Sequence, residues 1–320
     1  MNLSKGRIIL APMEGVVDAN IRHLLTQLGG IDLCVTEFIR ITDRLLPEHE
    51  FFRHATELAL DGSTPSGIPV VVQLLGSDPS ALADNALRAA HMGAPSIDLN
   101  FGCPSKTVNK HKGGAVLLDE PDLINEIVST VRKAVPAHIP VTAKMRLGNY
   151  DKTLAIDNAC AIDEAGANGL TIHARTKVEG YKPPAHWEWI ARVKEHVRLP
   201  VTANGEVWNC ADYIRCRELS GCDDVMIGRG LIARPELGLM IKSYQRGIVQ
   251  DEAAWRDIIQ ILLEYLSLVE AKLPPKYVHG RIKQWLNMMR PQRLEAVDLF
   301  AAVKGMTDVT QVRGMLEAQL

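Results

Sequence analysis

The amino-acid sequence predicts an α/β protein: a (β/α)₈ TIM barrel followed by a small C-terminal helical bundle. Short β-rich runs alternate with helix-like segments eight times within about 245 residues, which is the size of such a barrel. Several of the runs are apolar until their last few residues, as in strands that are covered on both faces. After about residue 248 the strand signals stop, and helical periodicity continues to the end of the chain.

The first part of the chain supplies the expected barrel. A doubly wound open sheet is the alternative, but it would need a glycine fingerprint after the first strand, and "LAPMEG" (10–15) does not have one. Helix-like segments, several ended by glycine, include 80–93, 121–135 and 154–166. The expected strands are 7–13, 33–38, 69–75, 96–102, 140–146, 169–175, 200–206 and 223–230.

The last part of the chain predicts four amphipathic helices separated by Pro or Gly breaks. We therefore expect two domains, a catalytic barrel over residues 1–247 and a helical domain over residues 248–320, packed as a bundle. The helical segments are 251–272, 276–290, 293–306 and 308–320.

Composition indicates an ordinary globular protein with 47 % hydrophobic residues and a net charge of −2. No apolar run is long enough to cross a bilayer, and the N-terminal apolar stretch is too short for a signal peptide, so we expect a cytoplasmic protein without membrane contact. Six cysteines without a C-x-x-C pair favour a reducing compartment and no metal site. The net charge argues against a uniformly basic protein, but not against a local basic face.

Polar side chains gather at the C-terminal ends of the expected strands. Because side chains alternate between faces, residues two apart, such as Asp98 and Asn100, point to the same side. Barrel enzymes have their active sites at this rim. The residues at these strand ends are Met13 and Glu14, Glu37, Gln73, Asp98 and Asn100, Lys144 and Arg146, His173 and Arg175, Asn204 and Glu206, and Arg229.

This rim suits a phosphorylated ring cofactor. "ANGE" and "IGRG" end strands seven and eight, where barrels commonly bind phosphate, and Arg229 adds positive charge there. Lys144 and His173 can reach the same mouth, Gln73 can hydrogen-bond the edge of a heterocycle, and Ala11–Met13 offers a flat apolar platform. Flavin mononucleotide (FMN) fits these residues better than a sugar phosphate does.

Cys103 lies in the loop "NFGCPSK" after the fourth strand. A lone thiol is commonly a buried core residue, and a metal ligand or a nucleophile are further alternatives. Gly102 and Pro104 indicate a rim loop instead of a core helix, and a nucleophile would need a neighbouring base that the local sequence lacks. A cysteine titrates near a pKa of roughly 8.5, so it carries its proton at neutral pH. We therefore favour a proton donor.

Several motifs in fixed order give the chain a family likeness. It resembles the tRNA-dihydrouridine synthases from about residue 7 to residue 245, and "RIKQWL" (281–286), with "LLP" after Arg40, is similar to the bacterial C-type branch, which acts on uridine 16. The motifs are "LAPMEGVVD", "TEF", "VQLLG", "DLNFGCPSKTV…KGGAVLL", "AKMRLG", "IHARTK…GY", "ANGEVW" and "VMIGRGLIARP".

The resemblance implies an FMN-dependent oxidoreductase that reduces the C5–C6 double bond of a D-loop uridine in tRNA, with NADPH as electron donor. It implies Cys103 as the catalytic residue. The sequence shows no sign of an obligatory protein partner, so we expect a monomer. Glu206 departs from the Asp of many members, and Phe101 occupies a variable position. The implied flavin contacts are Ala11, Pro12, Met13, Gln73, Lys144, His173, Asn204, Gly205, Glu206, Gly228 and Arg229, and the implied tRNA contacts are Arg40, Asn100, Tyr181, Arg281 and Lys283.

The thiol and the C-terminal domain fit this reaction. Hydride addition to uracil C6 leaves negative charge over C5 and O4, and a protonated thiol can then supply the proton at C5. Residues 272–293 contain six Lys or Arg and no Asp or Glu, which predicts attraction to an RNA backbone. The cationic side chains within 106–112 either belong to a solvated loop or contact further phosphates of the RNA. Trp285 and Leu286 are expected in the core.

Overall fold

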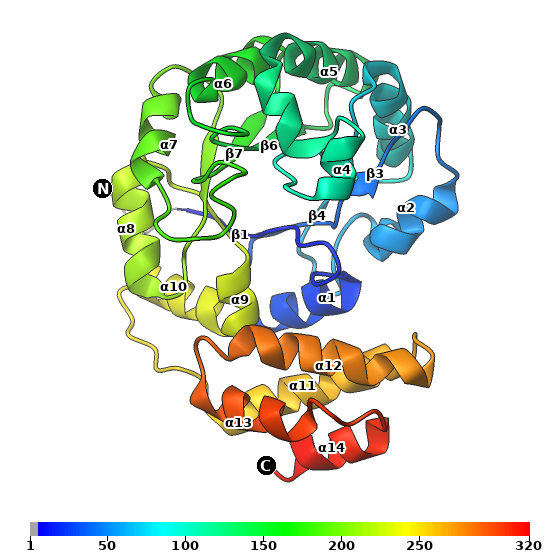
Figure 1. Cartoon of the computed structure of the whole chain (residues 1–320), viewed down its shortest axis with the longest axis vertical. Helices are drawn as coiled ribbons and strands as arrows, with labels where there is room; N and C mark the ends of the chain where they lie inside the picture. Colours follow the sequence, from blue (N-terminus) through cyan, green and yellow to red (C-terminus); the bar gives the residue numbers. More distant parts are fainter. Residues whose placement is uncertain (1–5) are drawn as a thin grey trace.

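A computed structural model describes residues 6–320 and contains a closed barrel of parallel strands (Figure 1). The strand β1 pairs with β2 on one side and with β9 on the other, which closes the sheet. The predicted fold class is therefore confirmed. The barrel strands are β1 (Ile8–Leu10), β2 (Leu33–Val35), β4 (Val70–Leu75), β5 (Ile97–Phe101), β6 (Val141–Arg146), β7 (Gly169–His173), β8 (Val201–Asn204) and β9 (Val225–Ile227).

The second expected strand, 33–38, is interrupted in the structure. Its first part is β2, and the chain then continues into the two-residue strand β3 (Ile39–Arg40). Both β2 and β3 pair with β4, through Cys34 opposite Val70 and Ile39 opposite Leu74. Together they form one position of the barrel, so the eightfold repeat is kept.

Strand alternation divides the core into two layers. In β1, Ile8 and Leu10 pack in the large cluster shared with the surrounding helices, whereas Ile9 packs with Val35 and Val71 in a small separate cluster. This is the two-residue period of a strand buried on both faces. It explains why the strands read as apolar runs.

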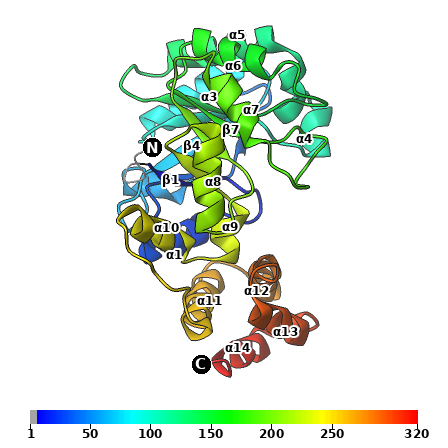
Figure 2. The same cartoon turned by 90° about the vertical axis from the view of Figure 1, so that its left-hand side faces the viewer.

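Helices surround the barrel, as Figures 1 and 2 show. Side-chain caps start several of them, including Asp18, whose carboxylate accepts from the Ile21 N–H at 3.0 Å, and Asp78, which accepts from the Ala81 N–H at 2.8 Å. The elements are α1 (Ala19–Leu28), α2 (Glu48–His54), η1 (Thr56–Leu60), α3 (Pro79–His91), α4 (Lys106–Lys110), η2 (Gly114–Asp119), α5 (Pro121–Ala134), α6 (Ala155–Glu164), α7 (Trp187–Lys194), α8 (Cys210–Ser220), α9 (Arg229–Ala233) and α10 (Leu237–Gln245).

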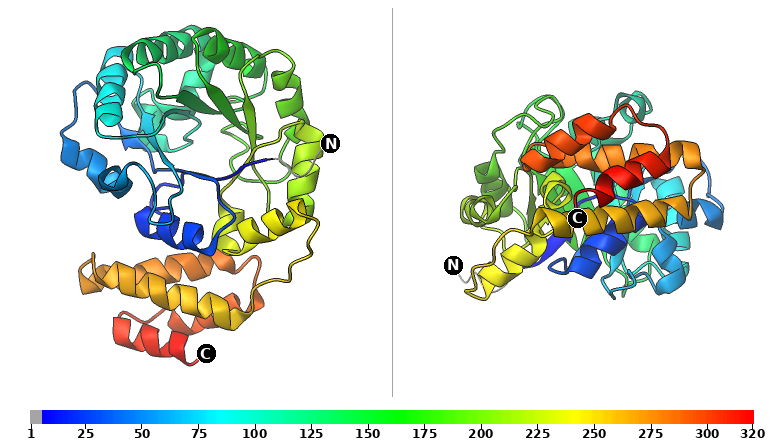
Figure 3. Two further views of the ribbon diagram at one scale, coloured as in Figure 1. Left: turned by 180° about the vertical axis from the view of Figure 1, so that it is seen from behind. Right: turned by 90° about the horizontal axis from the view of Figure 1, so that it is seen from below.

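The C-terminal helices form a bundle against one side of the barrel (Figure 3). Trp285 is buried as expected, and its indole N–H donates to the Ile232 carbonyl of α9 at 2.8 Å. The proposed domain boundary at 247/248 lies between α10 and α11. None of the helices in residues 6–320 has the length and apolar character of a membrane span. The bundle consists of α11 (Trp255–Glu270), α12 (Pro275–Met289), α13 (Leu294–Val303) and α14 (Val309–Glu317).

Candidate active site

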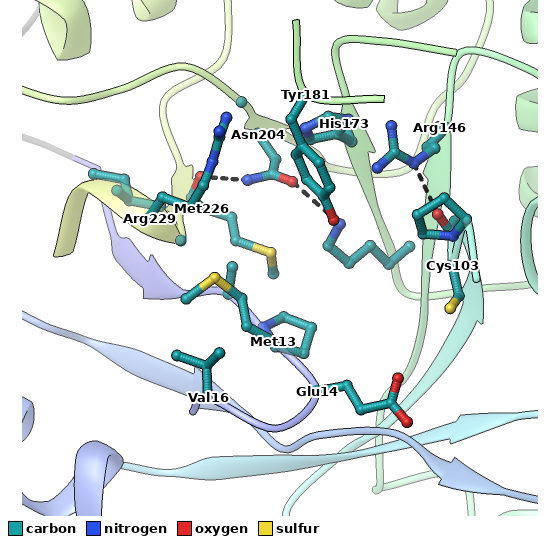
Figure 4. Close-up of a pocket in the computed structure, with 18 of the residues that line it drawn as sticks. Met13, Glu14, Val16, Cys103, Arg146, His173, Tyr181, Asn204, Met226 and Arg229 are labelled. Carbon is teal, nitrogen blue, oxygen red and sulfur yellow. Dashed lines mark hydrogen bonds between the residues drawn. The ribbon is translucent and has the colours of Figure 1, made fainter. Parts of the chain in front are cut away.

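The C-terminal ends of the barrel strands surround a cavity of about 400 Å³, within the size range of small-molecule sites (Figure 4). Most of the strand-end residues singled out from the sequence meet here, and Cys103 lies among them, whereas Glu37, Asp98 and Arg175 do not line the cavity. The expected cofactor and substrate residues that line the cavity are Ala11, Pro12, Met13, Gln73, Asn100, Cys103, Lys144, His173, Tyr181, Asn204, Gly205, Glu206, Gly228 and Arg229.

The loops after β1 and β9 form an apolar wall of this cavity. Met13 and Met226 lie next to each other in Figure 4. A Cβ atom added at Gly228 would lie 3.3 Å from the Met13 sulfur and 3.4 Å from the Ala11 Cβ. Glycine at this position therefore lets the two loops approach closely, and the wall that results is small and apolar, as the sequence predicted.

Lys144 brings positive charge to the cavity from β6. Its ammonium donates to the Asn204 side-chain oxygen at 3.1 Å, and the Asn204 amide donates to the Met226 carbonyl at 2.8 Å. Burial, with the nearby Arg146 guanidinium, lowers the pKa of Lys144 to about 8. Lys144 is therefore mostly charged at neutral pH and loses that charge at mildly alkaline pH.

His173 is a neutral imidazole at the end of β7. Burial, together with the cations Arg146 and Lys144, holds its pKa well below the ordinary value. Its Nδ1 is buried and has no hydrogen-bond partner within residues 6–320. A Cβ at Gly205 would lie 3.5 Å from the imidazole. A buried polar nitrogen without a partner fits a site where a ligand completes the hydrogen bonding.

Glu206 is the acidic residue among these cations. Its carboxylate pairs with Arg175 and lies 3.7 Å from the Arg229 guanidinium, and it accepts from the Trp208 indole N–H at 3.0 Å. Burial opposes ionisation, but the Trp208 and Arg175 hydrogen bonds outweigh it and keep the pKa of Glu206 below its usual range. Glu206 thus partly neutralises the Arg175–Arg229 pair and fixes their positions.

The thiol of Cys103 lies at the cavity wall with the residue 9 % exposed. Burial raises its pKa, and the Ser105 backbone N–H offsets only part of this effect. The Asn100 side-chain oxygen accepts from the backbone N–H groups of Gly102 and Cys103, both at 2.9 Å. The thiol therefore keeps its proton at neutral pH, on a loop held by side-chain hydrogen bonds.

Tyr181 is an exposed aromatic residue at the cavity mouth, with 53 % of its surface accessible. Its ring lies 4.9 Å from the guanidinium carbon of Arg229 and 5.3 Å from that of Arg146, and it meets the His173 ring edge-on at 6.1 Å. Figure 4 shows it in front of the cavity. The loop after β7 thus presents an exposed aromatic ring at the cavity mouth, beside Arg146, His173 and Arg229.

Arg146 lines the cavity and is a residue that the predicted site omitted. Its Nε donates to the Gly102 carbonyl at 2.8 Å, and its Nη1 donates to the carbonyls of Thr176 and Gly180 at 3.1 and 3.0 Å. The guanidinium thereby links the thiol loop to the Tyr181 loop. Its place two residues after Lys144, on the same face of β6, identified it from the sequence as a rim residue, but gave it no role in the predicted site.

The remaining expected tRNA contacts do not line the cavity. Arg40 is half-exposed at the end of β3. Arg281 pairs with Asp18 at 2.7 Å and donates to the Gly15 carbonyl at 2.5 Å, which joins α12 to the loop after β1. Lys283 donates to the Lys304 carbonyl at 3.2 Å. Arg281 and Lys283 therefore have partners within the chain.

The basic stretch 272–293 is less available to a partner than its charge count suggests. Arg293 is buried and pairs at 2.5 Å with Glu236, which belongs to the barrel domain. Lys272, like Arg281, has a partner in the barrel domain: it donates to the Asn20 side chain at 2.7 Å. Part of the positive charge of residues 272–293 therefore holds the bundle to the barrel. Met288 of α12, from the same stretch, lines the cavity, which the helical pattern did not indicate.

Comparison with known proteins identifies relatives over nearly the whole chain. The sequence profile of the dihydrouridine synthase (Dus) family matches residues 9–310. The chain is 54 % identical over 316 residues to the tRNA-dihydrouridine(16) synthase of Pseudomonas putida, covering 98 % of each. It is 50 % identical over 313 residues to the protein of the same name from Neisseria meningitidis serogroup B, covering 98 % of this chain and 94 % of the other.

Solved structures with low sequence identity share the fold. Histamine dehydrogenase from Rhizobium sp. 4-9 aligns with a TM-score of 0.55 at 13 % identity, over 82 % of this chain and 49 % of the other. A 2-naphthoyl-CoA reductase aligns with a TM-score of 0.56 at 14 % identity, over 76 % of this chain and 50 % of the other. These similarities support the barrel architecture.

Proposed function

The chain belongs to the dihydrouridine synthase family, and from that premise we propose that it is an FMN-dependent enzyme that reduces uridine 16 in the D-loop of tRNA. The observation that carries the proposal is the meeting of the Cys103 thiol with cationic and neutral polar strand ends at a single cavity, namely Gln73, Asn100, Lys144, Arg146, His173, Asn204 and Arg229. The names of the relatives supply the substrate and the position. We further propose NADPH as electron donor and a cytoplasmic monomer.

The residues at the cavity suit FMN. The cavity has the volume of a small-molecule site, its cations match an anionic ligand, and the unpartnered His173 Nδ1 offers a hydrogen bond. When bound and reduced with electrons from NADPH, FMN supplies a hydride at uracil C6. The residues proposed to hold it are Ala11, Pro12, Met13, Gln73, Lys144, His173, Asn204, Gly205, Glu206, Gly228 and Arg229.

Cys103 is the proposed general acid. Its S–H bond breaks as a C–H bond forms at uracil C5, and the thiolate that remains regains a proton from solvent. Burial keeps the thiol protonated before the transfer, and the charges of Arg146 and Lys144 favour the thiolate afterwards. A carboxylic acid of ordinary pKa would already have lost its proton at this pH.

The substrate uridine must leave its base stack to enter the cavity. Tyr181, with its exposed ring at the mouth, and Asn100, which lines the cavity, are proposed to contact the extruded nucleotide. Arg40, Arg281 and Lys283 are proposed to contact the tRNA outside the cavity. For Arg281 and Lys283 this contact would exist beside the internal hydrogen bonds described above.

The proposal is tested by giving the FMN-loaded protein unmodified tRNA and free uridine in parallel with NADPH. We expect dihydrouridine in the tRNA, at position 16, and none from free uridine. Mapping dihydrouridine in tRNA from cells that lack the protein should show the loss at the same position. Reduction of free uridine alone, or a purified protein that cannot be loaded with FMN, would overturn the proposal.

A further inference from the structure

A chain of buried hydrogen bonds leads from Asp98 to the loop that carries Cys103. Asp98 Oδ2 accepts from the Gln73 side-chain amide at 2.7 Å, and Gln73 Oε1 accepts from the Asn100 amide at 2.7 Å. Asn100 Oδ1 then accepts hydrogen bonds from the backbone N–H groups of Gly102 and Cys103. This series of hydrogen bonds begins inside the barrel and ends at the backbone of the loop that carries the thiol.

Neighbouring strands bring these side chains together. Gln73 of β4 lies directly opposite Asp98 of β5, and Asp98 in turn lies opposite Thr142 of β6. Asn100 follows two residues after Asp98, so both side chains are on the same face of β5. The Thr142 hydroxyl donates to the other Asp98 oxygen at 2.6 Å, which fixes the carboxylate from the opposite side.

The carboxylate gives this chain its direction. Both Asp98 oxygens accept hydrogen bonds, one from the Thr142 hydroxyl and one from the Gln73 NH₂ group, so the Gln73 oxygen is left facing Asn100. Burial raises the pKa of Asp98, and these two hydrogen bonds, with the nearby charge of Lys144, oppose that rise. Asn100 must then turn its own NH₂ toward Gln73 and its oxygen toward the thiol loop. A flipped amide at either residue would place two donors or two acceptors face to face.

Burial makes the arrangement costly to disturb. Asp98 is 4 % exposed, Gln73 is 0 % exposed and Asn100 is 9 % exposed. Water therefore cannot readily replace a lost partner, and a buried polar group without one is strongly unfavourable. The second support of the loop is independent, since Arg146 donates to the Gly102 carbonyl from β6.

From this geometry we infer that Asp98 is a positioning residue: acting through Gln73 and Asn100, it sets the orientation of the Cys103 loop and so of the thiol. The inference deepens the proposed function and rests on it for the role of the thiol. Asp98 itself does not line the cavity in the part of the chain that is described. The same carboxylate sets the amide of Gln73, which faces the cofactor position.

The test measures how fast iodoacetamide alkylates Cys103 in the holoprotein, peptide by peptide, with mass spectrometry. Asp98→Leu keeps the side-chain shape and removes both acceptors, whereas Asp98→Asn restores one acceptor toward Gln73. Thr142→Val is the matched control, because it removes a hydrogen bond to the same carboxylate that is not part of the series Asp98–Gln73–Asn100. Cys34 and Cys222, both 0 % exposed, report global opening.

We expect Cys103 to be alkylated about tenfold faster in Asp98→Leu, the population change that follows from losing about one net hydrogen bond. The rate should stay within about twofold of wild type in Asp98→Asn and Thr142→Val, and the Cys34 and Cys222 peptides should not change. Equal Cys103 rates in Asp98→Leu and Thr142→Val would overturn the inference. So would a parallel rise for all the cysteines.

If Asp98→Leu does not fold, Gln73→Met interrupts the same series of hydrogen bonds at its middle member, and we expect the same increase in the alkylation rate of Cys103. With tRNA as substrate, Asp98→Leu should lower kcat with little change in KM, and Asp98→Asn should restore it. The labelling does not depend on catalysis. A wild-type protein that reduces no tRNA would therefore refute the proposed function alone, whereas unchanged labelling in both chain-breaking variants would refute the positioning role alone.

Discussion

Replacing Cys103 by alanine tests the proposed proton donor directly. The Cys103 thiol lines the cavity, and its loop is held through backbone groups that the substitution leaves in place. We therefore expect FMN and tRNA affinity to stay near wild type. The rate of flavin oxidation by tRNA should fall about 10²- to 10⁴-fold, the usual contribution of a general acid.

The pH dependence of the rate gives a second and narrower expectation for the proton donor. A thiol with the ordinary pKa of roughly 8.5 is half protonated at pH 8.5, and burial raises the pKa of Cys103 above its ordinary value. An acid works only while it holds its proton, so its contribution is complete at neutral pH and is lost as pH rises through the raised pKa. The ratio of the wild-type rate to the Cys103→Ala rate should thus fall less than about twofold between pH 7 and pH 8.5.

The assay is single-turnover oxidation of the reduced holoprotein by saturating unmodified tRNA, followed by flavin absorbance from pH 6.5 to 9.5. Taking the ratio of the two proteins removes titrations that both share. Cys160→Ala is the matched control, since Cys160 is a half-buried thiol that does not line the cavity. A ratio near one at all pH values, or one already reduced more than about twofold at pH 8.5, would refute the reasoning.

Three further predictions test other parts of the site and its support. FMN affinity in the wild type should weaken as pH rises through about 8, where Lys144 loses its charge, and Lys144→Met should abolish that dependence in a fluorescence titration; an equal slope in both proteins would contradict it. Arg293→Met should cost about 3–5 kcal/mol in urea unfolding because it leaves Glu236 buried without its partner, and adding Glu236→Gln should recover part of the loss; full stability of the single variant would count against this. Arg281→Ala should weaken tRNA binding and lower Tm, whereas Asp18→Asn, which loses the same ion pair, should lower Tm alone; unchanged tRNA affinity in Arg281→Ala would exclude the contact.

The barrel could be predicted because its signals are local. A strand covered on both faces is apolar along its length, and eight such runs with intervening helices leave few other architectures. The strand ends were harder to predict. The interruption between β2 and β3 is invisible in "LCVTEFIR", since it depends on how both segments pair with β4.

Much of the candidate site could also be predicted, for a topological reason. Parallel barrel strands end at one rim, so residues at strand ends, such as Gln73, Lys144 and His173, must come together wherever they lie in the chain. Their protonation could not be predicted. The low pKa of His173 and the raised pKa of Cys103 come from burial and from neighbouring charges that only the packed structure provides.

Residue types and their periodicity determined the barrel, the bundle and the rim at which polar groups meet, because strand and helix periods are properties of neighbouring residues. Only the tertiary structure decided which partner each polar atom has. Arg281 and Arg293 read as cations available to RNA, yet their partners Asp18 and Glu236 lie 263 and 57 residues away. A guanidinium takes whichever carboxylate or carbonyl the fold brings within about 3 Å, and no local pattern encodes that choice.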